Sequence, residues 1–238
     1  MMCWSAPVSF LFGAIDTLMI SFLLWRRRGR DVTYASALGC VACQEWAQLA
    51  VWSTGSAVVS TQDDECTVGK AAIGFGMFAG SSSLPAVLVW RSVVDSRGKQ
   101  QVENGREERL SRRQVKALLL WFSASLLVLV ATVITESYCV MVGPRHHQVW
   151  ICAQSIYDLG GFPLYFAVLA MYAFANAYGL LALELPRTEL FWIGSISFAC
   201  GVVSYGFYFY SLEACSIWCW SAFSIGVYMC LRPLGKDD

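Results

Sequence analysis

Five polar or acidic side chains fall inside stretches of the chain that are otherwise apolar. They are Asp16, Gln44, Glu45, Gln48 and Asp158. Carboxyl and amide groups of this kind bind protons, cations and hydrogen-bonding solutes. The stretch Ala35–Trp52 carries three of the five, yet it is long and apolar enough to cross a bilayer. Because an ionisable group is costly in hydrocarbon, Glu45 is expected to face other protein or a wet cavity.

Helical geometry places the polar side chains of this stretch on one face, within an arc of about 140° at 100° per residue. Asp16 lies midway along the first apolar segment and Asp158 lies about ten residues into the fifth, so the three carboxyls reach similar depth. Gln154 and Ser155 share the face of Asp158. We predict a proton- or cation-linked binding site at the midplane of the membrane. The alternative is a structural polar network, with buried water, that only holds the helices together.

Two interruptions of the apolar segments favour the binding site. Pro163 cannot bond to the carbonyl of Leu159, so a kink is predicted beside Asp158. The run Gly80–Pro85 predicts a second break, in the third segment. Interrupted helices beside acids at mid-membrane depth are a pattern of transporters. Pro and Gly are also common in membrane helices that only pack against one another.

The composition indicates a single polytopic membrane domain over residues 1–238. Of the 238 residues, 57% are hydrophobic and 14% are charged, whereas soluble domains carry roughly 25% charged residues. Seven segments approach the ~20 residues that a spanning helix needs. They are Val8–Trp25, Tyr34–Trp52, Ala71–Trp90, Ala117–Ile134, Val149–Ala173, Leu190–Phe209 and Ser216–Leu231. We therefore predict an all-α fold, a bundle of seven transmembrane helices.

Two of the segments carry further signals about packing. The fourth is the most uniformly apolar, which is typical of a peripheral helix that faces lipid. The sixth aligns four small residues on one face, which suits close packing of helices. These are Gly194, Ser197, Gly201 and Ser204.

The distribution of Lys and Arg predicts the orientation of the bundle. Of the 17 Lys and Arg residues, only Lys70 and Arg145 fall outside loops one, three and five and the C-terminal tail. Because basic loops remain in the cytosol, we predict an outside N-terminus and a cytosolic C-terminus, in the plasma membrane or an endomembrane. Tryptophans lie at the inner interface (Trp25, Trp90, Trp192) and at the outer one (Trp4, Trp52, Trp150, Trp218, Trp220).

The third loop, residues Arg91–Lys116, is the one polar segment of any size. It is either a solvated linker or a contact for anionic lipid headgroups or a cytosolic protein. The net charge of zero gives no global field that would favour nucleic acid as a partner. The oligomeric state does not follow from the sequence.

Cysteines divide between the two predicted sides of the membrane. Cys40, Cys43, Cys200 and Cys230 fall within spans or near the inner face. The outer set, at the rim of the bundle, provides candidates for disulfides in an oxidising compartment. Its members are Cys3, Cys66, Cys139, Cys215 and Cys219. The Cys40–Cys43 pair has the C-x-x-C spacing of redox sites, but its place in a membrane helix favours simple packing.

The tetrapeptide Cys3–Ala6 recurs as Cys219–Ala222, each copy at the predicted outer end of a helix. A structural explanation assigns the Trp to the headgroup level, the Ser to a helix cap and the Cys to a disulfide bridge. The alternative is that the two copies form a paired rim around an outer opening. The chain resembles an uncharacterised family of polytopic membrane proteins in three places: the Met2-Cys3-Trp4-Ser5 start, Gln44 and Glu45 near Trp52, and Ser216–Trp220 at the start of the last segment. Its members come from protists, algae and large DNA viruses. The resemblance implies a seven-helix membrane fold and no particular activity.

Several activities lack the residues that they need. The chain has two His residues, adjacent in a predicted outer loop, which argues against a His-rich metal site. No lysine in the seventh segment could anchor retinal, and no phosphate-binding loop or nucleophile elbow is present. We therefore predict no catalytic residue, metal or cofactor, and consider an enzyme the least supported reading.

Three functions remain open. The first is a small-solute or ion transporter, linked to protons, that uses the midplane acids. The second is a seven-helix receptor or sensor that signals through the basic third loop. The third is a non-catalytic structural membrane subunit, in which the polar faces only pack helices.

Overall fold

The computed structural model describes residues 5–28, 30–53, 58–59, 72, 74, 76, 78–80, 82–100, 110–136, 141–142, 148–149, 151–208 and 219–232. The helices in this part of the chain are α1 (Ala6–Arg26), α2 (Asp31–Ser53), α4 (Leu84–Gln100), α5 (Arg112–Thr135), α6 (Ile151–Ala182), α7 (Arg187–Tyr208) and α9 (Cys219–Leu231). Three two-residue strands, β1 (Val58–Val59), β2 (Met141–Val142) and β3 (Gln148–Val149), form a small sheet in the order β1-β2-β3. Apart from this sheet, the predicted all-α class is confirmed.

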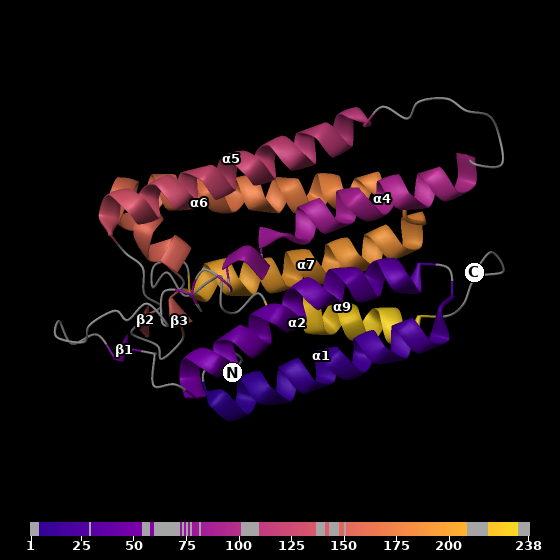
Figure 1. Ribbon diagram of the computed structural model, residues 1–238, viewed down its shortest axis with the longest axis horizontal. Coiled ribbons are helices and arrows are strands. Elements are labelled where there is room, and N and C mark those ends of the chain that lie inside the picture. Colours follow the sequence, from indigo (N-terminus) through magenta and orange to yellow (C-terminus); the bar gives the residue numbers. More distant parts are fainter. Residues whose placement is uncertain are drawn as a thin grey trace.

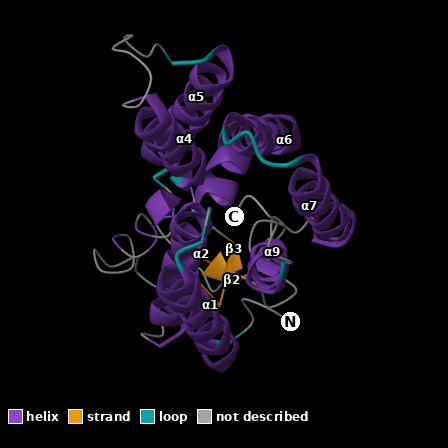
Figure 2. Cartoon of the chain, turned by 90° about the vertical axis from the view of Figure 1, so that its right-hand side faces the viewer, coloured by secondary structure: helices purple, strands orange, loops and turns teal. Residues whose placement is uncertain are grey.

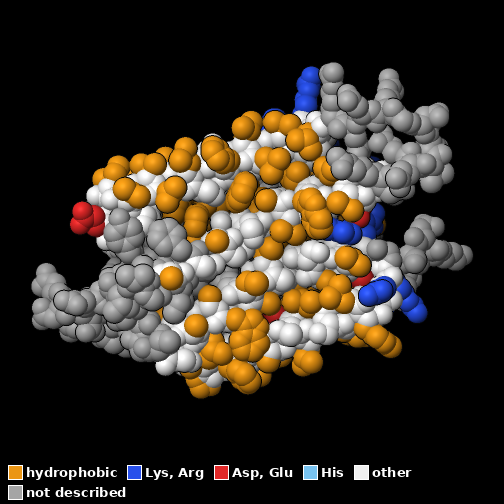
Figure 3. All heavy atoms as spheres, viewed as in Figure 1, with side chains coloured by type: hydrophobic (Ala, Val, Ile, Leu, Met, Phe, Trp, Pro, Cys, Tyr) orange, Lys and Arg blue, Asp and Glu red, His pale blue; other side chains and the backbone are white. Residues whose placement is uncertain are grey.

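The helices lie along one common axis and alternate in direction (Figure 1). The last residues of α1, α4, α6 and α9 and the first residues of α2, α5 and α7 gather at one end of the bundle. We call it the basic end, because Lys and Arg side chains gather there in the space-filling view (Figure 3). The small sheet lies at the opposite end (Figure 1).

The bundle consists of two groups of helices. The most extensive helix contacts are between α1 and α2 and between α5 and α6. Helix α9 packs against α1, α2 and α7, whereas α4 packs against α5 and α6 and also contacts α2. Figure 2, which looks along the bundle, shows α1, α2 and α9 on one side and α4, α5 and α6 on the other. Each group has its own buried apolar cluster, around Leu23 and Leu38 in the first and around Val128 and Tyr165 in the second.

Small residues allow the helices to approach closely at two interfaces. A methyl group at Gly226 of α9 would lie 3.1 Å from Leu38 Cδ2 of α2. A methyl group at Gly179 of α6 would lie 3.2 Å from Leu88 Cβ and 3.6 Å from the Pro85 carbonyl oxygen of α4. Contacts of this kind are a main source of helix association inside membranes.

The third predicted segment has different boundaries in the structure. A turn at Ser83 precedes α4, which begins at Leu84 with Pro85 in its first turn, so the predicted break falls where α4 starts. The helix then continues past Trp90 to Gln100, ten residues into the predicted loop. An ion pair between Arg91 and Asp95, one turn apart, supports this extension.

The packing predicted for the small residues of α7 is wrong at two of its four positions. Ser204 is buried, but no atom of the described residues lies within 4 Å of a methyl group placed at Gly194 or Gly201. Ile193, the residue before Gly194, occupies the buried position instead. The reason is that α7 packs mainly against α9 and turns its glycines away from that contact.

Four of the described helices are long and apolar enough to cross a membrane. They comprise Ala6–Arg26, Arg112–Thr135, Gln154–Ala182 and Arg187–Phe207, and Ala222–Leu231 is a shorter apolar helix. Hydrophobic side chains cover the middle of the bundle in Figure 3. As predicted, α5 is peripheral and exposes a large apolar face, which includes Leu119, Phe122, Leu126, Leu129 and Val133. The length and composition of these helices are therefore compatible with a membrane protein.

Gly179→Val is expected to destabilise the contact between α4 and α6. The added side chain would overlap Leu88, and overpacking of this kind costs about 1–3 kcal/mol. Thermal melting of the purified protein in detergent, followed by tryptophan fluorescence, measures the effect. Gly194→Val is the matched control, because that position is open; equal melting temperatures for the two variants would contradict the interface.

Candidate functional site

Asp16 and Glu45 lie on facing sides of α1 and α2. A methyl group at Gly13 would lie 3.1 Å from Trp46 Cε2 and 3.5 Å from Glu45 Cβ, so the helices approach closely there. One turn further along α1, Trp46 Nε1 donates a hydrogen bond of 3.2 Å to Thr17 Oγ1. Asp16 lies between these two contacts in the sequence, on the buried face of α1. The structure thus brings Asp16 and Glu45, which we call the acidic pair, to the same interface.

Other polar side chains are buried at this interface. Asp16 and Glu45 are each 1% exposed, and Gln44 and Gln48 share the buried face of α2, as their spacing indicates. Ser9, two helical turns before Asp16, is also fully buried. Within the described residues, Asp16 Oδ1 and Ser9 Oγ have no hydrogen-bond partner. Ser9 was not predicted from the sequence, although its spacing from Asp16 places it on the same face of α1.

These surroundings make an isolated charge at Asp16 costly. Neither α1 before Arg26 nor α2 contains a Lys or Arg, and α9 contains none. A carboxyl group buried without an opposite charge takes up a proton or requires a bound cation or hydrogen-bond donor. The acidic pair is therefore suited chemically to hold a proton, a small cation or a polar solute.

Asp158 lies apart from the acidic pair. Its side chain is exposed on α6, where Gln154 Nε2 donates a hydrogen bond of 2.6 Å to Asp158 Oδ1. The neighbouring Ser155 is buried and accepts a hydrogen bond from Thr132 of α5. Asp158 is exposed although Ser155, one turn earlier on nearly the same face of α6, is buried against α5. The cluster of three acids expected from their depth is reduced to a buried pair.

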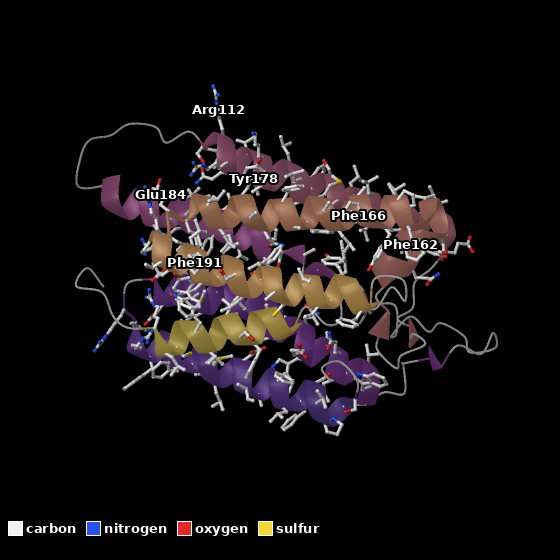
Figure 4. The ribbon with its side chains drawn as sticks, turned by 180° about the vertical axis from the view of Figure 1, so that it is seen from behind. Arg112, Phe162, Phe166, Tyr178, Glu184 and Phe191 are labelled. Atoms are coloured by element: carbon white, nitrogen blue, oxygen red, sulfur yellow. The ribbon has the colours of Figure 1, made fainter. Side chains whose placement is uncertain are left out.

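The kink predicted in α6 is present. Gly160 and Gly161 have non-helical backbone angles, and Gly161 has φ 64° and ψ −163°. This conformation is essentially restricted to glycine. Pro163 follows two residues later, and the change of direction is visible beside Phe162 (Figure 4). The kink separates the short segment that carries Asp158 from the long remainder of α6.

A second polar cluster, at the basic end, was not predicted from the sequence. Arg26 donates two hydrogen bonds of 2.7 Å, through Nε and Nη2, to the carboxylate of Asp31. The backbone N–H of Arg28 donates to the same carboxylate at 3.0 Å. Arg26 also donates to the carbonyl oxygens of Met229 and Cys230 in the last turn of α9. One guanidinium group therefore joins the ends of α1, α2 and α9.

Arg232 extends this cluster to α7. Its guanidinium group forms an ion pair with Glu189, near the start of α7, and Nη2 lies 3.6 Å from Asp31 Oδ1. Tyr34 donates its hydroxyl hydrogen bond to Glu189, and its ring lies 5.2 Å from Arg232 Cζ. Arg30 Nη1 lies 3.9 Å from Glu189 Oε2. We call this set, Arg26, Arg30, Asp31, Tyr34, Glu189 and Arg232, the ion network.

The ion network changes the acidity of Asp31, which precedes the predicted span Tyr34–Trp52. Burial alone disfavours the charged carboxylate. The hydrogen bonds from Arg26 and Arg28 and the charges of Arg26 and Arg232 outweigh burial, so the pKa of Asp31 is lowered from its ordinary value. A signal was present in the sequence, because an acid directly follows four arginines. Only the fold shows that Arg232, at the other end of the chain, reaches it.

Two further polar contacts join α4 to its neighbours at the same end. Thr33 of α2 donates a hydrogen bond of 3.2 Å to Asp95. Gln114 closes a capping box with Ser111 at the start of α5 and also donates a hydrogen bond of 2.9 Å to Ser92. The first contact joins α2 to α4, and the second holds the start of α5 against α4.

The cysteine predictions are tested only in part. Cys3, Cys66, Cys139 and Cys215 lie outside the described residues, and only the backbone of Cys219 is described. Cys40, Cys43, Cys200 and Cys230 are free thiols. Cys40 is buried and accepts a hydrogen bond of 3.5 Å from Ser83 Oγ, in keeping with a packing role. Within the described residues, no group of three His, Cys, Asp or Glu side chains is placed to hold a metal ion.

Comparisons with protein-family models, with curated proteins and with solved structures find no match to this chain.

Asp31→Asn is expected to destabilise the bundle by about 3–5 kcal/mol, because it leaves buried arginine charge without its partner. The melting temperature in detergent measures the loss. Glu184→Gln is the control, because Glu184 is an exposed acid at the same end of the bundle. Similar melting temperatures for both variants would show that the ion network contributes little.

The stability of the wild-type protein is expected to fall in acid. Asp31 has a lowered pKa in the folded protein, so its contribution is fully present above the unfolded value of about 3.9 and is lost as the pH falls further. Melting temperatures between neutral pH and about pH 3 test this. In the Asp31→Asn variant the decline below about pH 4 is expected to be shallower; an unchanged profile would exclude Asp31 as its source.

Proposed function

We propose that this chain is an integral membrane protein that moves a small solute or an ion in a proton-linked manner through the acidic pair. The observation that carries the proposal is the burial of Asp16, in a helix long and apolar enough to span a bilayer, with a carboxylate oxygen that has no hydrogen-bond partner among the described residues. Ionisable groups inside membrane helices usually mark the path of a proton, ion or substrate.

The proposal includes seven spans, an outside N-terminus and a cytosolic basic end. The alternation of the helices supports it, because every loop predicted to be cytosolic begins or ends at the basic end. The exposed tryptophans Trp25, Trp90 and Trp192 also lie on the helices near this end, as expected at a membrane interface. Either the plasma membrane or an endomembrane fits this orientation.

A purely structural role for the polar residues is the main alternative. Polar side chains that only hold helices together are expected to bond to one another, as Gln114, Ser92 and Ser111 do at the basic end. Asp16 Oδ1 and Ser9 Oγ differ from that pattern, since neither has a hydrogen-bond partner in the described part of the chain. An occupant such as a proton, a water molecule or a polar solute would satisfy them.

The arrangement of the helices provides a route for coupling protonation to movement. The acidic pair belongs to the group formed by α1, α2 and α9, and this group contacts α4, α5 and α6 mainly through α2 and α4. Loss of a proton from Asp16 would place a charge in an apolar interface and favour a different packing of the two groups. The ion network joins the same helices at the basic end. We therefore propose that it blocks the solute path on the cytosolic side.

Asp16→Asn and Glu45→Gln are each expected to abolish proton-linked flux. Both substitutions preserve size and remove the group that binds the proton. The purified protein is reconstituted into liposomes that contain a pH-sensitive dye, and the collapse of an imposed proton gradient is followed with and without a membrane potential.

Asp158→Asn is the matched control, because it removes an exposed acid from a different helix, and it is expected to retain flux. Wild-type flux in Asp16→Asn would favour the structural subunit. Loss of flux in Asp158→Asn but not in Asp16→Asn would place the path along α6.

A further inference from the structure

Exposed cations from three separate parts of the chain gather at the basic end. They are Arg27, Arg28, Arg112, Arg113, Lys116 and Arg187, which we call the basic surface. The first two lie between α1 and α2, the next three in the first turns of α5, and the last begins α7. Figure 3 shows Lys and Arg side chains at this end, and in Figure 4 Arg112 points away from the bundle.

The acids at this end are largely occupied within the protein. Asp31 and Glu189 are buried in the ion network, and Asp95 is paired with Arg91. Of the acids in the described residues at the basic end, only Glu184 is exposed without an ion pair. Among the described residues, internal pairing therefore leaves the positive charge of the basic surface without nearby acids to balance it, apart from Glu184.

The positive charge is most concentrated at the start of α5, where it is electrostatically unfavourable unless an anion binds. Arg112, Arg113 and Lys116 occupy its first turns, and its first turn contains no acid. The N-terminal end of a helix carries a partial positive charge that favours acids, so three cations there repel both the helix end and one another. An anion bound against them would convert this repulsion into attraction.

Three exposed tryptophans lie near the basic surface. Trp25 on α1, Trp90 on α4 and Trp192 on α7 are 80%, 58% and 51% exposed. Each lies near a basic residue in the sequence, and Trp90 stacks with the guanidinium group of Arg91 at 5.6 Å. Tryptophan indoles favour the headgroup level of a bilayer. The cations follow these tryptophans around several helices, and in a bilayer such a position corresponds to the level of the lipid phosphate groups.

We infer that the basic surface binds anionic phospholipid headgroups of the leaflet at this end of the bundle. Its cations come from the connection between α1 and α2 and from the starts of α5 and α7, near the exposed tryptophans, and a leaflet can contact all of them at once. A cytosolic protein would instead be expected to dock on one continuous face. The inference needs membrane insertion and the orientation proposed above, but it does not depend on transport.

The test compares the wild-type protein with the variant Arg112→Gln, Arg113→Gln, Lys116→Gln in nanodiscs of phosphatidylcholine, with or without phosphatidylserine. Native mass spectra of the released protein count the retained phosphatidylserine. Each cation near an anionic surface is worth roughly fivefold in binding, so removal of three is expected to weaken retention by roughly 100-fold. Higher salt is expected to weaken retention by the wild-type protein.

The variant Arg112→Lys, Arg113→Lys preserves the charge and is expected to retain phosphatidylserine as the wild type does. Melting temperatures in pure phosphatidylcholine show whether each variant is folded, and Glu184→Gln is expected to strengthen retention slightly. Equal retention by the wild type and the neutral variant would overturn the inference. Retention of phosphatidylserine that does not depend on salt would also overturn it. A third contrary result would be a neutral variant that retains phosphatidylserine but no longer binds a purified cytosolic protein.

Discussion

Removing a charged group from water costs several kcal/mol unless opposite charge and hydrogen bonds meet it, and this constraint governs both the end and the middle of the bundle. At the basic end, Asp31 and Glu189 are buried, and Arg26 and Arg232 meet them. In the middle, Asp16 is equally buried, but α1 before Arg26, α2 and α9 contain no Arg or Lys. The same constraint therefore gives a paired cluster at the basic end and, in the middle, a buried carboxyl group with an oxygen that has no hydrogen-bond partner among the described residues.

The acidic pair and the ion network lie on the same helices, so the packing of one affects the other. Helices α1 and α2 carry the acidic pair, and their ends at Arg26 and Asp31 anchor the ion network. Through Arg232 and Glu189 the network also holds α9 and α7. A change in the packing of α1 against α2 would therefore alter the basic end as well. Because the internal pairs occupy most of the described acids there, the exposed cations are available for the contact with anionic headgroups that we propose.

Predictions from the sequence were most accurate for features that depend only on residues close together along one helix. The shared face of Gln44, Glu45 and Gln48 and the kink before Pro163 depend on residues within one or two helical turns of each other. The boundaries of α4 and the open face of α7 were less predictable. Whether a helix continues past Trp90, or which side of α7 is buried, depends on the neighbours that it meets.

The sequence by itself determined the helical class, the membrane character of the long apolar segments and the clustering of basic residues. Each of these is encoded in composition and in short-range pattern. Only the tertiary structure decided that Asp16 and Glu45 are buried at the same helix interface while Asp158 is exposed, and that Arg232 reaches Asp31 from the other end of the chain. The physical reason is that depth along a helix follows from counting residues, whereas the direction in which a side chain points depends on which helices pack against it.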